Sequence, residues 1–489
     1  MAAAAPFAVL LVLLGSLAPA SAQSSGSAGW LQFQGGPDHP GETADAGGGP
    51  APPYRVRWTF PAPDGTSLSA AVLVDGTAIA IGREAVYGVE LSTGQKDWEV
   101  PRDGGPLSVP AVGELDGRQV LLYLEGPAPG GAPSPTSAPT PTSAPPASPT
   151  SASPDEGKGT ETALVALDLR DRSERWRIGL GATARSGVTV DGDTIYVGDQ
   201  SGTVHAVALD DGAERWTTDL VGHADLPLAV GEGIVYAVSR DPDGRRIRIT
   251  ALDASGGEQA WSVSPQIGST AASAPSATSA GVVIATADRL VQVLDAEDGE
   301  QRWATLLLSL SSPVSAPATG GDDVLVADIG GGLYRLDPAD GARRWGFQFN
   351  ELVLRSSPVR SGGAVLVGLN DGGLAAVDLD HGRLVWEGAT GPGLVGTMAV
   401  SRDTVVAVKG GPDAGLIAFE HDPDGTLVDV ASPTELTPGT TLARAGLAAL
   451  AVFAAAFVPA LLARRRFGDA LVPEDAGGEN GDDLEEGGE

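Results

Sequence analysis

The stretch that decides the fold is LDPADGARRW, residues 336–345, because close variants of it recur along the chain. The variants are LDDGAERW at 209–216, LDAEDGEQRW at 294–303 and VDLDHGRLVW at 377–386. Two aspartates and a glycine in this order resemble part of a calcium-binding loop, although such a loop has no use for the tryptophan that ends every copy. The stretch is therefore either a metal site used many times or a structural joint used many times.

Variation among the copies favours the joint. A calcium cage needs several oxygen ligands at set positions in one short loop. Here the carboxylate eight residues before the tryptophan is replaced by Ala208 in one copy, and LRDRSERW at 169–176 has lost the glycine. Aspartate and glycine in a hairpin instead satisfy local backbone groups and supply positive φ. We interpret the stretch as a turn between two strands.

The tryptophans show the period of the repeat. From Trp58 onward, successive tryptophans are 40 to 45 residues apart, except for one gap of 78 that contains the segment rich in Pro, Ser and Thr at 126–159. Each period holds short strand-like runs, such as TIYVG at 194–198 and TVHAVAL at 203–209, separated by glycine turns. About four strands in some 40 residues are typical of a propeller blade. We predict an all-β protein in which residues 54–431 form an eight-bladed β-propeller of four-stranded antiparallel blades, with seven blades as the alternative.

Two irregular repeats indicate how the ring closes. The last repeat, 403–430, has Val428 where a tryptophan is expected, while Trp58 in YRVRWTF at 54–60 follows no complete repeat. Both facts are explained if residues 54–60 form the outer strand of the final blade, because closure removes exposed sheet edges. The segment at 126–159 then lies inside the second blade as a disordered loop, either O-glycosylated or bare.

Both ends of the chain carry membrane-directed signals. An apolar run followed by small residues predicts a signal peptide at 1–22, with an uncleaved anchor as the alternative. Residues 445–463 contain no charge and are followed by three arginines, which predicts a transmembrane helix with the tail in the cytoplasm; a buried core helix is the alternative. The other segments are a lead-in at 23–53, a stalk at 432–444 and an acidic cytoplasmic tail at 464–489. We expect a single-pass protein of the cell membrane with its ectodomain outside.

Composition excludes several function classes. The chain has 63 acidic and 31 basic residues, a formal charge of −32, which disfavours a nucleic-acid partner. It has no cysteine, so disulfides, thiolate metal sites, a cysteine nucleophile and a lipidated cysteine are all ruled out. Its five histidines have no metal-type spacing, and no phosphate loop or nucleophile elbow occurs.

The repeat resembles that of the PQQ-like, or quinoprotein-type, β-propellers, which reads Ala-x-Asp-x-x-x-Gly-x-x-x-Trp. Residues 251–261 match it fully, with Ala251, Asp253, Gly257 and Trp261. The glycine four before the tryptophan also occurs at Gly94, Gly212, Gly299, Gly341 and Gly382, and is replaced by Arg172. The segment GWLQFQGGPDHPG at 29–41 resembles the lead-in of exported members through Trp30, Phe33, Gly35, His39 and Gly41.

This resemblance implies one fold and two classes of function. The family includes quinone-dependent dehydrogenases, in which calcium polarises the quinone and adjacent cysteines pack on it, and non-catalytic propellers such as the BamB-type scaffold of outer-membrane protein assembly. Adjacent cysteines are absent here. We expect a non-enzymatic, monomeric cell-surface binding or scaffold protein whose partners are cell-envelope or secreted proteins, without a cofactor or a metal. The alternative is a dehydrogenase of alcohols or sugars that holds PQQ and calcium in the central funnel.

The residues singled out for a role are structural. A large indole can pack between neighbouring blades while its N–H donates to a backbone carbonyl. We expect the repeating tryptophans to dock one blade on the next: Trp58, Trp98, Trp176, Trp216, Trp261, Trp303, Trp345 and Trp386.

Overall fold

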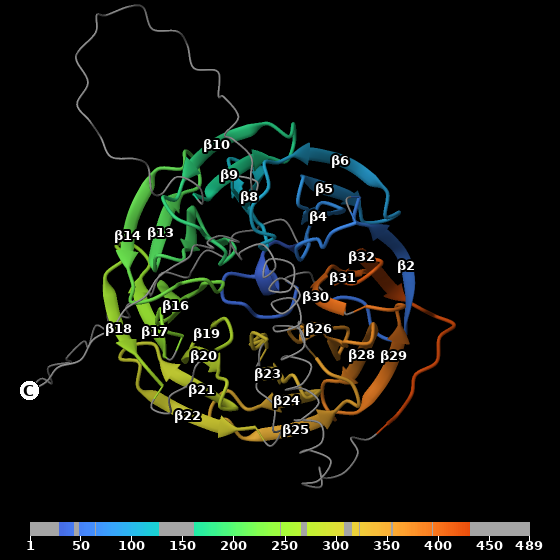
Figure 1. The fold of residues 1–489 in the computed structure, drawn as a ribbon. Coiled ribbons are helices and arrows are strands. Elements are labelled where there is room, and N and C mark those ends of the chain that lie inside the picture. The colour runs from blue at the N-terminus through green and yellow to red at the C-terminus, as the bar shows by residue number, and fades with distance from the viewer. Residues whose placement is uncertain are drawn as a thin grey trace, which may run out of the picture.

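The ring of blades is complete in the computed structural model of the chain (Figure 1). The structure describes residues 29–43, 48–63, 65–126, 161–244, 246–265, 271–307, 315–321, 323–353, 356–393 and 395–430. Eight antiparallel sheets are arranged around a common centre, which confirms the eight-bladed propeller. The signal peptide, the stalk, the transmembrane helix and the tail predicted from the sequence lie outside the described residues, and so does the loop predicted at 126–159 apart from Gly126. Within the described part of the chain, no helix has the length and apolar character needed to cross a membrane.

Each blade is a meander of neighbouring strands, counted from the centre outward. Blade 1 contains β3 (Val72–Val74), β4 (Thr77–Ile81), β5 (Ala85–Glu90) and β6 (Lys96–Pro101). Blade 2 contains β7 (Ala111–Leu115), β8 (Arg118–Glu125), β9 (Ala163–Asp168) and β10 (Glu174–Gly179). Blade 3 contains β11 (Thr189–Asp191), β12 (Thr194–Gly198), β13 (Thr203–Ala208) and β14 (Glu214–Asp219). Blade 4 contains β15 (Ala229–Gly231), β16 (Ile234–Arg240), β17 (Ile247–Asp253) and β18 (Gln259–Val263).

The second half of the ring follows the same order. Blade 5 contains β19 (Ser276–Thr278), β20 (Gly281–Ala285), β21 (Leu290–Asp295) and β22 (Gln301–Leu306). Blade 6 contains β23 (Val324–Ala327), β24 (Gly332–Leu336) and β25 (Arg343–Gln348), and an isolated bridge between Ala318 and Leu325 stands where its inner strand would be. Blade 7 contains β26 (Val359–Ser361), β27 (Ala364–Gly368), β28 (Gly373–Asp378) and β29 (Leu384–Ala389). Blade 8 contains β30 (Val395–Val400), β31 (Val405–Lys409), β32 (Gly415–His421) and β2 (Tyr54–Pro61).

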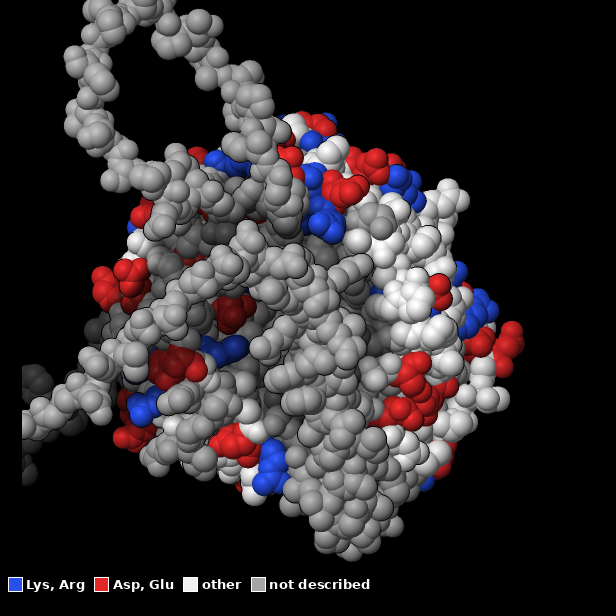
Figure 2. Space-filling model, viewed as in Figure 1, with Lys and Arg blue, Asp and Glu red and all other residues white. Residues whose placement is uncertain are grey.

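The residue pattern of a strand follows its place in the blade. Middle strands such as β12 and β27 are buried along their whole length, because a neighbouring blade covers each face, and they read as continuous apolar runs. Outer strands such as β14 alternate, with charged side chains facing solvent and Trp216 facing inward. Carboxylates and arginines therefore lie side by side around the rim of the face shown in Figure 2.

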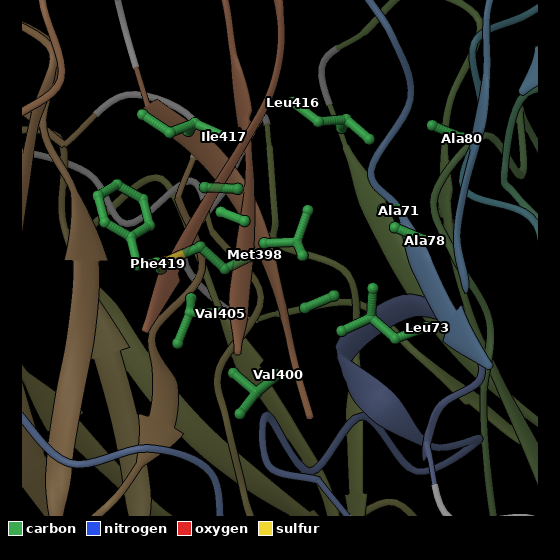
Figure 3. Packing of buried hydrophobic residues seen from close by; sticks show 14 of the residues in the cluster. Ala71, Leu73, Ala78, Ala80, Met398, Val400, Val405, Leu416, Ile417 and Phe419 are labelled. Atoms are coloured by element: carbon green, nitrogen blue, oxygen red, sulfur yellow. The ribbon is translucent and has the colours of Figure 1, made fainter. Parts of the chain in front are cut away.

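The ring closes through β2, as the sequence predicts. This strand pairs with β32, in a register that runs from Tyr54 opposite His421 to Pro61 opposite Gly415. Apolar side chains of blades 8 and 1 then belong to one buried cluster, whose members include Leu416 of β32 and Leu73 and Ala78 of blade 1 (Figure 3). A closed ring leaves each blade covered on both faces, so that the apolar middle strands are removed from water.

Candidate functional site: the blade seams and the lead-in

The lead-in, residues 29–43 and 48–53, follows the inner strands around the centre of the ring, where Figure 1 shows it in dark blue. It begins as β1 (Gly29–Trp30), which pairs with β3 and makes the sheet of blade 1 five-stranded. A short 3-10 turn, η1 (Phe33–Gly35), follows. The backbone then accepts one hydrogen bond from each of five blades: Leu31 from Val112 (2.8 Å), Pro37 from Val230 (2.7 Å), Asp38 from Ala277 (2.9 Å), Pro40 from Gly320 (2.7 Å) and Gly41 from Arg360 (2.8 Å).

Blades 3 and 8 are contacted in other ways. The Gln32 amide donates to the Val190 carbonyl (3.0 Å) and accepts from the Val190 N–H (2.8 Å). These are the two hydrogen bonds that a neighbouring strand would make with the inner strand of blade 3. Gly49 lies against the Val400 side chain of blade 8. One segment of the chain therefore touches all eight blades, and it satisfies inner-strand backbone groups that would otherwise lack partners at the centre of the ring.

Of the residues that matched the lead-in pattern, Trp30, His39 and Gly41 are buried, and Phe33 and Gly35 are partly buried. Trp30 is 1% exposed, and the His39 ring contacts Phe33 edge-on at 4.9 Å between ring centroids. The Nδ1–H of His39 donates to the Pro275 carbonyl at 2.6 Å, and burial lowers the pKa of His39 to about 4. This histidine is therefore neutral at physiological pH and acts as a hydrogen-bond donor inside the ring.

Acidic side chains surround the same segment. Burial raises the pKa of Asp38, and the nearby charges of Glu42 and Asp191 raise it further. Asp323, which is buried in blade 6, contacts the guanidinium groups of three arginines: Arg335, Arg344 (2.7 Å) and Arg360. Because Arg360 also pairs with Glu42 at 3.5 Å, this network joins the lead-in to blades 6 and 7. A buried carboxylate needs such partners to remain charged.

Six of the eight predicted docking tryptophans donate their indole N–H to a carbonyl of the next blade. The pairs are Trp58 with Leu91 (2.8 Å), Trp176 with Leu209 (3.1 Å), Trp216 with Ala254 (3.0 Å), Trp261 with Ala296 (2.9 Å), Trp303 with Pro338 (2.8 Å) and Trp345 with Leu379 (2.7 Å). Three residues after each acceptor, the motif glycine lies against the same indole with positive φ: Gly94, Gly212, Gly257, Gly299, Gly341 and Gly382. The glycine of each copy therefore contacts the tryptophan of the preceding blade, while the tryptophan of the same copy docks on the following blade.

The other two tryptophans are placed differently. At the seam of blades 1 and 2, Trp98 meets the guanidinium of Arg172 at 5.2 Å from the ring centroid. At the seam of blades 7 and 8, Trp386 contacts Tyr54 edge-on at 5.1 Å. The edge of β29 there pairs with the chain segment that follows blade 8, through the Val428 N–H to the Val385 carbonyl (2.9 Å). The missing glycine at position 172 and the missing tryptophan at 428 were the sequence signals for these two exceptions.

The aspartates of the opening stretch bind their own backbone, which confirms the turn. Asp337 accepts from the Ala339 N–H (2.9 Å) and Asp340 from the Ala342 N–H (2.8 Å). That backbone hydrogen bond and the one from Arg344 lower the pKa of Asp337. Among the described residues, no three His, Asp or Glu side chains are grouped so that they could hold a metal ion. This absence and the lack of cysteine in the sequence mean that the described residues do not match a calcium and PQQ site.

Comparison with known proteins agrees with this geometry. The model of the family described as "Outer membrane protein assembly factor BamB" matches residues 160–305 and 245–421, together more than half of the chain. A curated relative, the outer membrane protein assembly factor BamB from Salmonella typhimurium, is 34% identical over 103 residues, which cover 19% of this chain and 26% of the relative. The match thus spans about a quarter of that relative's length.

Solved structures show the same fold at low identity. BamB from Moraxella catarrhalis is 19% identical, with a TM-score of 0.53 over 75% of this chain and 100% of that one. The quinohemoprotein alcohol dehydrogenase from Comamonas testosteroni is 13% identical, with a TM-score of 0.57 over 85% of each chain. Since both classes of propeller superpose on this chain, the fold alone does not choose between them.

Proposed function

Because the chain belongs to the family of the outer membrane protein assembly factor BamB, we propose that it is a non-enzymatic propeller that binds other proteins of the cell envelope. The observation that supports this proposal best is the path of the lead-in. It runs around the centre of the ring and is hydrogen-bonded to the inner edges of blades 2 to 7. The centre is thus built as a structural joint, and the turns on the two faces of the ring are the parts left to contact a partner.

The placement at a membrane extends this proposal. The helix predicted at 445–463 would hold the ring at the outer surface of the cell membrane, with the acidic tail inside. Each blade of a closed ring packs against two neighbours, so the ring is a rigid platform whose turns keep fixed positions relative to one another. Such a platform suits a scaffold that holds envelope or secreted proteins, and we propose that the ring itself is monomeric.

Site-directed photo-crosslinking of the full-length protein in native membranes tests the scaffold role. A crosslinking amino acid is placed at Ala339, in the hairpin between β24 and β25, or at Ser201, in the turn between β12 and β13 on the opposite face. Thr217, on the outer strand β14, serves as the wall control. We expect the same envelope protein to be captured from at least one face and not from the wall. Capture from the wall alone would contradict the proposal.

A parallel measurement addresses the enzymatic alternative. The purified full-length protein is incubated with PQQ and calcium and then separated from free quinone. We expect no retained quinone absorbance and no dye reduction with alcohols or sugars. Retention of one PQQ per protein, together with dye reduction that depends on substrate, would contradict the scaffold role and support a dehydrogenase.

A further inference from the structure

The seam between blades 1 and 2 departs from the arrangement at the six regular seams. Arg172 occupies the position of the docking glycine and keeps its left-handed backbone, with φ 62°. The indole of Trp98 lies over its own blade instead, since a methyl group on Gly88 would be 2.6 Å from Trp98 Cδ2. Within the described residues, the Trp98 N–H has no hydrogen-bond acceptor. The tryptophan that should join these two blades is therefore turned away from its usual carbonyl.

A cavity of about 630 Å³ opens beside this tryptophan, within the range of small-molecule sites. Its walls come from the turn between β3 and β4, from the turn between β7 and β8, and from the turn between β9 and β10. The charged and aromatic residues that line it are Trp98, Arg118, Arg170, Arg172, Asp75 and Glu114. Three guanidinium groups in one cavity are unusual for a chain with twice as many acidic as basic residues.

The three arginines of this cavity differ in their partners. Arg118 pairs with the buried Asp168 at 3.4 Å, and Arg172 pairs with Asp97 at 3.7 Å. In the part of the chain that the structure describes, Arg170 has no ion pair, and the Nε–H of Arg172 is buried without an acceptor. Guanidinium and indole groups donate hydrogen bonds and cannot accept them. Asp75 and Glu114 also line the cavity, but the side chains of Arg170, Arg172 and Trp98 offer donors alone, so a ligand that binds them must bring the acceptor.

The other end of this seam is closed. Arg102, which is buried, donates to the Gly82 carbonyl of blade 1 and to the Leu124 carbonyl of blade 2, each at 2.8 Å. These bonds hold the two blades together beneath the cavity. The opening at Trp98 is thus confined to the hairpin end of this seam.

We propose that this seam binds a carboxylate carried on an apolar or aromatic body. Arg170 and Arg172 bind the carboxylate, since guanidinium and carboxylate match in bidentate geometry, and the body packs on the indole of Trp98. The carboxylate belongs either to a free organic acid or to the C-terminus of a peptide chain. This site lies on the rim of the ring and is independent of the scaffold role proposed above.

A binding experiment on the full-length protein in detergent tests the site. Phenylacetate is titrated by calorimetry beside its uncharged analogue 2-phenylethanol, and the acetylated peptide Ala-Ala-Phe is used with a free or an amidated C-terminus. We expect saturable binding of at least one free carboxylate and weaker binding of its neutral counterpart. Preference for phenylacetate assigns the site to free acids, and preference for the free peptide assigns it to chain ends. Equal binding of charged and neutral probes, or no binding up to millimolar concentration, overturns the proposal.

Variants locate the binding in the seam. Arg170→Ala should weaken it about tenfold or more, because a charge-assisted hydrogen bond is lost. Arg172→Gly restores the glycine of the regular seams and should also weaken binding, because it removes the second guanidinium group from the cavity. The matched control is Lys96→Ala, which removes a cation from the similar cavity of about 640 Å³ between blades 8 and 1, where Trp58 is docked. Unchanged affinity in both arginine variants, or an equal loss in the control, would contradict the assignment. Melting temperatures confirm that each variant is folded.

Discussion

Gly341 of blade 6 lies directly against Trp303 of blade 5: a methyl group on its Cα would be 2.8 Å from Trp303 Cδ2. Its φ of 72° adds a second restriction, since residues with a side chain rarely adopt that backbone. The glycine of one blade and the tryptophan of the preceding blade therefore form a single joint. The spacing within one copy of the motif does not show this contact, because the glycine and the tryptophan that touch belong to different copies.

Gly341→Ala should destabilise the ring for two reasons, backbone strain and the clash with Trp303. Strain of this kind costs about 1–2 kcal/mol, and overpacking adds about 1–3 kcal/mol. Gly363→Ala is the control, because Gly363 has φ 78° and open space where its methyl group would lie. Urea unfolding should give a clearly larger loss for Gly341→Ala. Equal losses would mean that the indole contact contributes nothing.

Trp303→Ala should cost about 3–5 kcal/mol in the free energy of unfolding, the range for deletion of a buried aromatic side chain. Trp303 is 7% exposed and donates to the Pro338 carbonyl. Trp98→Ala should cost less, because its indole is only partly buried and has no acceptor among the described residues. Thermal and chemical unfolding of the two variants compare them directly. A larger loss for Trp98→Ala would contradict the docking role of the hydrogen-bonded tryptophans.

The stability of the ring should decrease between pH 6.5 and pH 4 because of His39. The pKa of this residue falls from 6.5 to about 4 on folding, so in this window the unfolded chain binds a proton that the folded ring excludes. At about 1.4 kcal/mol per pKa unit, the full effect is roughly 3 kcal/mol. Asp38 acts in the opposite direction: its pKa is raised above 3.8, so just above pH 3.8 the folded ring holds a proton that the unfolded chain releases.

His39→Gln is the variant that isolates this effect, because the amide keeps a donor for the Pro275 carbonyl but does not titrate. Unfolding measured at pH 7 and pH 5 should show a smaller decrease for the variant than for the natural protein. The same decrease in both proteins would assign the acid sensitivity to other groups.

Asp340→Asn should change the stability by well under 1 kcal/mol, because the amide oxygen can still accept from the Ala342 N–H in the exposed turn. For the same reason, millimolar calcium should leave the melting temperature of the natural protein unchanged. Differential scanning fluorimetry with calcium and with chelator checks both statements. A rise in melting temperature that depends on calcium and disappears in Asp340→Asn would restore the metal interpretation of this stretch.

Some features of the ring could be read from residue types alone. The number of blades followed from the tryptophan spacing, and ring closure by 54–60 followed from one repeat without a tryptophan and one tryptophan without a repeat. The turn at 336–345 followed from the drift of its aspartates. Each of these inferences uses contacts between residues that are close in sequence, or a pattern repeated many times, so that one irregular copy does not obscure it.

Two features could not be predicted from residue types: the path of the lead-in and the orientation of Trp98. The lead-in binds through backbone carbonyls to strands that are up to about 320 residues away, and a carbonyl carries no residue-type signal. Arg172 showed that a glycine was missing, but whether Trp98 turns away depends on the space over Gly88. The sequence thus determined the number of blades and the position of the hairpin turn that precedes each tryptophan. Only the tertiary structure decided what fills the centre and at which seam the tryptophan is turned away from its usual carbonyl, because both depend on which groups the closed ring brings together.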